Sequence, residues 1–308
     1  MTKIWRIHLK PAAKKYDPRK LCLEENVVGI GWRRQDGDNA KNISWEEYYA
    51  LAERTYGQNK KDKRAWFSAV TAFKDKLDID DLVWTRDWHG NYFIGRVTGK
   101  WEYRCEDNYS SADIVNIRQC DWKKVGTVDC VPGKVVNSFI PPRTIQQIHS
   151  NTVSIFSQKK YNDFLEREYY SYEFLTTNRN IFSLLSAEDC EDVIAIYLQV
   201  KFNYIVIPSS CKADTMAYEF VLINRKTNKI AVIQVKTGNE SLRGMDYDEI
   251  VADEIYLFAS SGIYDVKGCS DRIKTILPEE IKTFMRENEK LLPSKIRFWI
   301  GVIMENDW

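Results

Sequence analysis

The chain has 308 residues, a length that predicts two domains, and 44% of them are hydrophobic, enough to bury substantial cores. A formal net charge of +1 neither requires nor excludes a nucleic-acid partner, and seven scattered cysteines without a C-x-x-C pair argue against a zinc ribbon or a disulfide framework. The chain has no run of 18 apolar residues and no apolar signal core at its start, so we expect a cytoplasmic protein without a membrane partner.

The first part of the chain, residues 1–148, has the pattern of a small, strongly bent sheet or barrel with helices packed on it. A helix is expected over 44–57, where Ser44 and Glu47 form a capping-box pattern, and a second helix is expected over 62–77. The runs that predict strands lie at 3–9, 27–32, 81–87, 92–99, 101–106 and 114–122.

The second part of the chain begins after a polar, Tyr-rich and partly helical connector, residues 149–180. Residues 181–308 alternate helices and strands, which predicts a compact α/β domain with a central mixed sheet, so the whole chain belongs to the α+β or α/β class. Helices are expected at 186–199 and 278–292, a hairpin at 218–236, and strands at 202–208, 254–262 and 296–304.

The hairpin carries an unusual polar pair. Its second strand, IAVIQVKTG, has the composition of a buried strand but places Gln234 and Lys236 on one face. A turn centred between Lys226 and Thr227 puts Glu219 opposite Gln234, and a shift of one residue would send the two to opposite faces. The three polar groups therefore indicate an active site or, alternatively, a cross-strand salt bridge with Gln234 on a solvated face.

The helix at 186–199 adds an acid to this group, because Glu191 lies about one turn from its start. Oxygen ligands without His or Cys suit Mg²⁺ or Mn²⁺. A carboxylate, an amide and a lysine around such an ion suit phosphodiester hydrolysis, in which the lysine stabilises the developing charge.

Three segments, in this order, resemble the PD-(D/E)xK nuclease superfamily and most of all its Mrr-like restriction branch: SAEDCEDVIAIYL, AYEFVL and VIQVKTG. The resemblance covers about residues 180–300. It implies a Mg²⁺- or Mn²⁺-dependent endonuclease in which Glu219, Gln234 and Glu191 bind the metal and Lys236 supports the attacking water. Gln234 stands where an acid is commoner, which keeps a catalytically inactive reader as the alternative. Asp214 is a rival for the metal-binding acid, although the predicted register places it beyond the hairpin.

The first 145 residues resemble PUA-like domains of the EVE type, most clearly over AWFSAVTAFKDKLDIDDLVWTRDWHGNYFIGRVTG. The resemblance implies a nucleic-acid reader that holds a flipped, modified base between aromatic rings. The expected base-binding residues lie at strand ends and a turn: Trp32, Trp84, Trp88 and Tyr92. Trp32 and Trp84 are alternatively core residues.

The basic run from Lys60 to Arg64 is suited to contact phosphates, or is simply a solvated surface. Together the patterns predict a prokaryotic restriction or anti-phage endonuclease that selects double-stranded DNA with residues 1–148 and cuts it with residues 181–308. One site per chain predicts a homodimer on duplex DNA. RNA remains an alternative target.

Overall fold

The computed structural model describes residues 2–9, 16–33, 43–171, 180–212 and 217–304. Its architecture is α+β. The chain divides into two compact units, which we call unit 1 (residues 1–131 and 135–174) and unit 2 (residues 132–134 and 175–308). The change of unit at 174/175 falls inside the expected connector, and the helix α6 (Asn151–Leu165) is part of unit 1. Among the described residues, no helix is long and apolar enough to cross a membrane.

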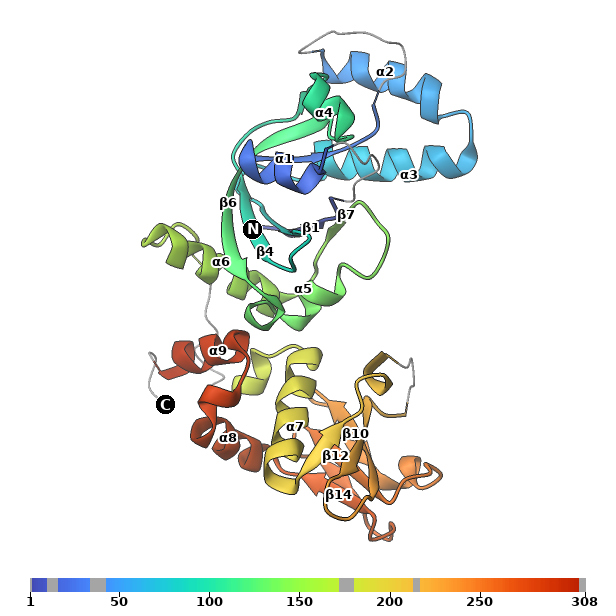
Figure 1. The fold of residues 1–308 in the computed structure, drawn as a ribbon, viewed down its shortest axis with the longest axis vertical. Coiled ribbons are helices and arrows are strands. Elements are labelled where there is room, and N and C mark those ends of the chain that lie inside the picture. The colour runs from blue at the N-terminus through green and yellow to red at the C-terminus, as the bar shows by residue number, and fades with distance from the viewer. Residues whose placement is uncertain (1, 10–15, 34–42, 172–179, 213–216, 305–308) are drawn as a thin grey trace. The chain divides into compact units, whose positions relative to one another are not determined.

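Unit 1 is built on one curled sheet with the strand order β2-β6-β4-β3-β1-β7, and β5 pairs with β6 (Figure 1). β1 runs parallel to β3, and the other pairs are antiparallel. The strands are β1 (Ile4–Ile7), β2 (Val27–Ile30), β3 (Leu82–Arg86), β4 (Tyr92–Val97), β5 (Glu102–Tyr103), β6 (Asn116–Gly126) and β7 (Ile145–Gln147).

Helices cover both faces of this sheet. On one face, Tyr48 and Trp66 from two of the helices are buried against Trp5 of β1. On the other face, α6 packs against Trp84, whose ring lies 6.5 Å from that of Phe156. The helices are α1 (Pro18–Glu24), α2 (Trp45–Tyr56), α3 (Lys60–Thr71), α4 (Asp107–Ser111), α5 (Gly133–Asn137) and α6. The predicted cap of α2 is confirmed, because the Ser44 hydroxyl accepts a hydrogen bond from the backbone N–H of Glu47.

Unit 2 contains a mixed sheet with the order β14-β12-β10-β9-β8. β10, β12 and β14 are mutually parallel, whereas β8, β9 and β10 are antiparallel. Its elements are α7 (Ala187–Phe202), β8 (Tyr204–Val206), β9 (Phe220–Asn224), β10 (Ile230–Lys236), β11 (Leu242–Arg243), β12 (Glu254–Ala259), β13 (Tyr264–Asp265), β14 (Ile273–Ile276), α8 (Pro278–Glu287) and α9 (Ser294–Met304). β11 and β13 pair with each other, outside this sheet.

The predicted register of the hairpin is confirmed. β9 and β10 pair Ile223 with Ile230 and Phe220 with Ile233, the register that the turn predicts, and Glu219, just before β9, lies with Oε1 at 3.0 Å from the amide nitrogen of Gln234. A side chain alternates between the two faces of a strand. Glu219, Gln234 and Lys236 therefore lie on one face of the sheet.

The expected strand at 296–304 is wrong, because these residues form α9. The buried side chains of Ile296, Trp299, Ile300 and Ile303 recur at helical spacing. A short run that is apolar throughout has no period that separates a buried strand from a buried helix. Here the helical form buries one side of α9 inside unit 2.

Candidate functional site

The hairpin of unit 2 forms the centre of the candidate active site. The Gln234 amide nitrogen donates a hydrogen bond to Oε1 of Glu219 at 3.0 Å. Gln234 is only 3% exposed, so it does not lie on a solvated face. Burial raises the pKa of Glu219, and the charge of Lys236 and the hydrogen bond from Gln234 offset part of that rise. Glu219 is thus hydrogen-bonded to Gln234 and feels the charge of Lys236, as expected from the predicted register.

The oxygen of the Gln234 amide has no hydrogen-bond partner among the described residues. A carboxylate only accepts hydrogen bonds, so the amide atom that contacts Glu219 is the nitrogen and not the carbonyl Oε1. Among the described residues, this buried oxygen has no hydrogen-bond donor. An unsatisfied buried acceptor costs about 1–3 kcal/mol. A cation would satisfy it, and amide oxygens are ordinary ligands of Mg²⁺ and Mn²⁺.

Glu191 reaches the same region from α7. Burial raises the pKa of Glu191 to about 8, and the nearby charges of Glu219 and Glu188 add to the rise. Carboxylates that raise one another's pKa are stabilised when a cation lies between them. Glu191, Glu219 and Oε1 of Gln234 therefore suit a divalent ion by charge and by donor type.

The acids alone do not form a metal site. Among the described residues, no three His, Cys, Asp or Glu side chains meet in a group that could hold a metal ion. An ion bound at this place would depend on the Gln234 oxygen as well as on Glu191 and Glu219. Asp214, the rival acid, lies outside the described residues.

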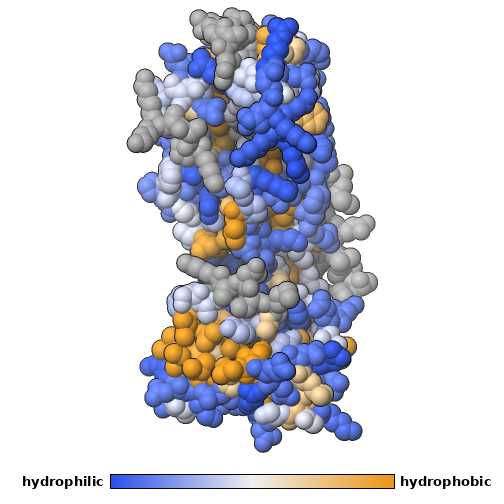
Figure 2. Space-filling view, turned by 90° about the vertical axis from the view of Figure 1, so that its right-hand side faces the viewer, coloured by the Kyte–Doolittle hydropathy of each residue, from blue (hydrophilic) through white to orange (hydrophobic). Residues whose placement is uncertain are grey.

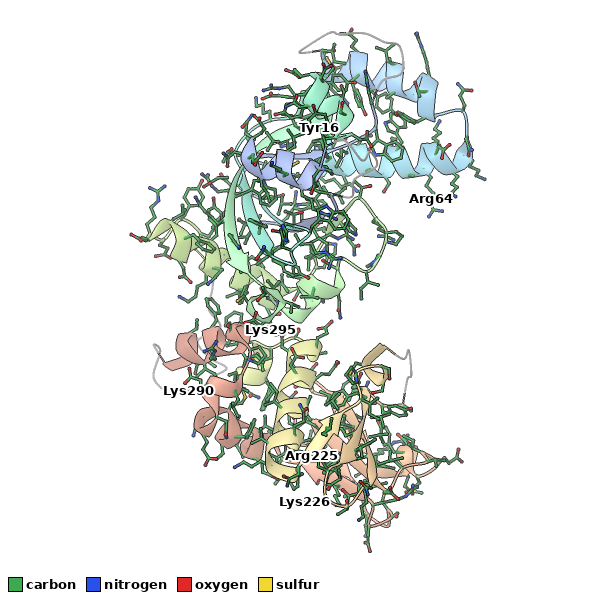
Figure 3. The ribbon with its side chains drawn as sticks, in the orientation of Figure 1. Tyr16, Arg64, Arg225, Lys226, Lys290 and Lys295 are labelled. Atoms are coloured by element: carbon green, nitrogen blue, oxygen red, sulfur yellow. The ribbon has the colours of Figure 1, made fainter. Side chains whose placement is uncertain are left out.

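A buried lysine fixes the end of the helix that carries Glu191. Lys295 of α9 makes ion pairs with Asp189 at 2.8 Å and with Asp192 at 2.7 Å, and its side chain is 6% exposed (Figure 3). Asp189 also closes a capping box with Ser186 at the start of α7. Lys295 is not singled out by any sequence pattern, because its role depends on α9, which the sequence predicted as a strand.

Away from the candidate site, the same face of the sheet is apolar. Unit 2 has apolar surface, orange in the lower half of Figure 2. Three of the exposed isoleucines in unit 2 are neighbours across the strands, since Ile205 pairs with Ile223 and Ile223 pairs with Ile230. By alternation they share the face of Glu219 and Gln234. The polar groups are thus confined to one end of that face.

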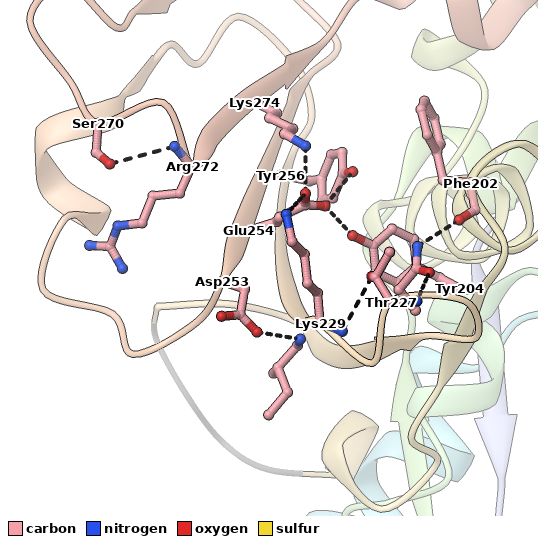
Figure 4. Close-up of polar contacts among 12 residues, drawn as sticks. Phe202, Tyr204, Thr227, Lys229, Asp253, Glu254, Tyr256, Ser270, Arg272 and Lys274 are labelled. Atoms are coloured by element: carbon pink, nitrogen blue, oxygen red, sulfur yellow. Dashed lines mark hydrogen bonds and ion pairs between the residues drawn. The ribbon is translucent and has the colours of Figure 1, made fainter.

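Glu254 forms a second polar cluster at the start of β12 (Figure 4). The candidate site lies at the other end of this strand, where Ala259 pairs with Lys236. Its carboxylate accepts hydrogen bonds from Lys274 at 2.8 Å, from Lys229 at 3.3 Å, and from the hydroxyls of Tyr204 and Tyr256. Both of its oxygens are partnered, whereas Oε1 of Gln234 has no donor in the part of the chain that the structure describes. This cluster is therefore structural.

In unit 1, two of the four expected base-binding residues are core residues. Trp84 is fully buried, and its indole N–H donates to the Ser157 hydroxyl at 3.0 Å. Tyr92 is 3% exposed and packs edge-on against Phe139. The expectation that these two rings stack on a base is wrong for this structure, because both sit on strands whose side chains fill the core.

Trp88 and Trp32 remain accessible. Trp88 lies in the turn between β3 and β4, is 65% exposed, and has the guanidinium of Arg19 at 4.0 Å from the ring centre. Trp32 follows β2 with a φ of 71°, a left-handed conformation that is rare for a bulky residue and costs on the order of 1–3 kcal/mol. The Tyr48 hydroxyl donates to the Trp32 carbonyl at 3.0 Å and helps to hold that conformation.

Trp32 lies between two neighbouring cavities. Both cavities are lined by Trp32, Pro142 and Thr144. The larger cavity measures about 870 Å³ and has a cationic lining: Lys60, Lys61, Arg64 and Arg143. The smaller one measures about 350 Å³ and is lined by Tyr56, Asp113, His8 and the end of β2. We call the two together the Trp32 cavity.

The cations of the Trp32 cavity come from the basic run that the sequence singled out, with Arg143 in addition. Arg64 projects from α3 in Figure 3. Lys63 differs from its neighbours, because it pairs with Glu53 at 3.7 Å instead of lining the cavity. Arg143 and Asp113 are not distinguished by any motif, and they reach the cavity only because the sheet curls.

The geometry defines an α+β chain with an acid–amide–lysine site in one unit and a cationic, aromatic cavity in the other. A family described as Domain of unknown function (DUF8426) matches residues 5–147, which span the sheet of unit 1 from β1 to β7. No curated protein and no solved structure matches the chain.

Proposed function

We propose that the chain is a metal-dependent DNA endonuclease of a restriction or anti-phage type. Unit 2 would be a PD-(D/E)xK-like nuclease domain, and unit 1 a PUA-like domain of the EVE type that selects the DNA. The observation that carries this proposal is the buried Gln234 amide, which binds Glu219 through its nitrogen while its oxygen has no donor among the described residues.

In unit 2, three residues would bind the metal ion and one lysine would stabilise negative charge. Glu219, Oε1 of Gln234 and Glu191 would hold Mg²⁺ or Mn²⁺. Such an ion supplies Lewis-acid polarisation of the phosphate and makes water more acidic. Lys236 carries a positive charge on the same face, where it stabilises the negative charge that develops on the phosphate during hydrolysis. The hydrogen bond between Glu219 and Gln234 keeps both ligands in a fixed orientation before the substrate arrives.

Unit 1 supports the binding step. The cations of the Trp32 cavity, Lys60, Lys61, Arg64 and Arg143, suit the phosphates of a DNA strand. The Trp32 ring offers a stacking surface beside them, and stacking on an aromatic ring contributes about 1–3 kcal/mol per base. A base turned out of the duplex would enter the smaller part of the cavity. Cutting both strands with one site per chain calls for two copies of the chain on the DNA.

The test is a cleavage assay with Mg²⁺ or Mn²⁺ on DNA whose bases are unmodified, methylated, hydroxymethylated or glucosylated. The parent should cut at least one of these DNAs, and Lys236→Ala should lower the rate at least about 100-fold while DNA affinity is retained. Lys226→Ala is the matched control, because Lys226 is an exposed lysine in the turn of the same hairpin (Figure 3). Equal cleavage by the Lys236 variant and the parent would contradict the proposed site.

A catalytically inactive nucleic-acid reader is the second candidate. It is favoured by the amide at position 234, which leaves fewer than three acids in the site among the described residues. Under this alternative the parent binds DNA or RNA but cuts neither with any metal. Competition between matched DNA and RNA duplexes would then identify the target.

A further inference from the structure

Asp113 gives the smaller part of the Trp32 cavity a hydrogen-bond acceptor. It follows α4 in a left-handed backbone conformation, with a φ of 53°, and it lines the cavity together with Trp32 and Tyr56. Among the described residues, no hydrogen bond to its carboxylate is found. Burial raises its pKa, and the charge of Arg33 only partly offsets the rise. A half-buried acceptor with no donor is stabilised by a ligand that brings one.

The end of β2 is shaped around this carboxylate. A Cβ atom at Gly31 would lie 2.5 Å from Oδ2 of Asp113, closer than any real contact, so a larger residue at position 31 would displace the carboxylate. The Trp32 ring follows directly and meets Tyr56 edge-on, with the ring centres 5.2 Å apart. An aromatic face and an acceptor thus lie beside each other in one cavity, whose other part is cationic.

We propose that Asp113 makes the Trp32 cavity selective for a nucleobase that carries an exocyclic amino group. The inference rests on the proposed binding function of unit 1. An ionised carboxylate accepts hydrogen bonds from the amino group of cytosine, adenine or guanine. Thymine and uracil have no amino group, and their one ring N–H lies between two carbonyl oxygens that repel a carboxylate. Stacking on Trp32 tolerates every base, so the discrimination falls to Asp113.

The experiment measures binding of the full chain, with Lys236→Ala to prevent cleavage, to DNA duplexes that each carry one bulged base at the same position. Bulged cytosine, adenine and guanine should bind at least about fivefold more tightly than bulged thymine. Asp113→Asn should reduce that ratio, because an amide both donates and accepts. Asp107→Asn, which changes an exposed acid of α4, should leave the ratio unchanged.

Equal affinity of the parent for all four bulged bases would overturn the proposal, and this arm needs no variant at position 113. A ratio that survives in folded Asp113→Asn protein would also overturn it. Free nucleosides that compete as well as the bulged duplexes would overturn the assignment to a base within DNA. If the parent shows the base preference but cuts no DNA, the inference holds and only the nuclease proposal fails. If no bulged duplex binds better than a fully paired one, the base-reading role of unit 1 fails together with the inference.

Discussion

The two candidate sites of this chain are built from different ionisable groups. In unit 2, burial raises the pKa of both Glu191 and Glu219, and the charge of Glu219 adds to the rise at Glu191. In unit 1, the Trp32 cavity is instead lined by Lys60, Lys61 and Arg64. The cations of the Trp32 cavity attract a phosphate directly, whereas in unit 2 a bound metal ion would supply the positive charge that two carboxylates do not. We therefore expect salt to act mainly on binding through unit 1 and divalent metal to act mainly on cleavage through unit 2.

The largest effect that would sharpen this comparison concerns Glu219. Glu219→Gln removes one of the two acids of the candidate site, the one bound to the Gln234 amide nitrogen, and we expect metal-dependent cleavage to fall by about 100-fold or more. DNA affinity measured without divalent metal should not fall, because the lost charge is negative. Single-turnover cleavage and fluorescence anisotropy measure the two effects. Glu249→Gln, at an exposed acid of the same unit, is the control, and equal cleavage by parent and Glu219→Gln would rule out the site.

The second prediction tests whether unit 2 depends on its buried ion pairs. Lys295→Met leaves Asp189 buried without its cation, and breaking a buried pair in this way costs about 3–5 kcal/mol of the free energy of unfolding. Urea unfolding followed by tryptophan fluorescence and circular dichroism should show an earlier transition and lower cleavage. Lys290→Met, at an exposed lysine near the start of α9, should change neither (Figure 3). An unchanged transition in Lys295→Met would show that the pair does not hold α9 on α7.

The third prediction concerns the cations of unit 1. Replacement of Lys60, Lys61 and Arg64 together by alanine should weaken DNA binding and reduce the slope of affinity against salt concentration by about three, one for each lost phosphate contact. Cleavage at saturating DNA should be nearly unchanged. The control is Lys63→Ala on the same helix, since Lys63 pairs with Glu53. A salt slope equal to that of the parent would show that the cavity does not bind phosphates.

The smallest effect is a pH dependence that belongs to the structural cluster of unit 2. Burial alone would raise the pKa of Glu254, but Lys274, Tyr204 and Lys229 lower it from the ordinary 4.5 to about 2. Because the folded pKa lies below the unfolded one, the stabilisation is present above pH 4.5 and is lost as the pH falls towards 2.

Glu254→Gln should therefore lower the free energy of unfolding at neutral pH by about 1–2 kcal/mol, a value reduced by solvent screening. The difference from the parent should shrink at about pH 3. Urea unfolding at the two pH values measures it. Glu289→Gln, at an exposed acid, should behave as the parent does at both. A difference that is the same at both pH values would assign the effect to packing and not to charge.

The sequence by itself determined the parts of the molecule that depend on near neighbours. The turn between β9 and β10 sets which residues are opposite, so the register of the hairpin, and with it the approach of Glu219 to Gln234, followed from counting. The Ser44 cap of α2 also follows from four consecutive residues. In both cases the interacting residues are close in the chain, so local backbone geometry alone decides how they are arranged.

Tertiary structure decided the rest, because the deciding partners are far apart in the chain. Trp32, Asp113 and Arg143 meet only when the sheet of unit 1 curls, and Trp84 became a core residue because α6 packs over it. The apolar run that forms α9 has no distinguishing period, so packing chose the helix and brought Lys295 to Asp189. Likewise, the Gln234 oxygen is buried without a donor among the described residues only because other elements close around it.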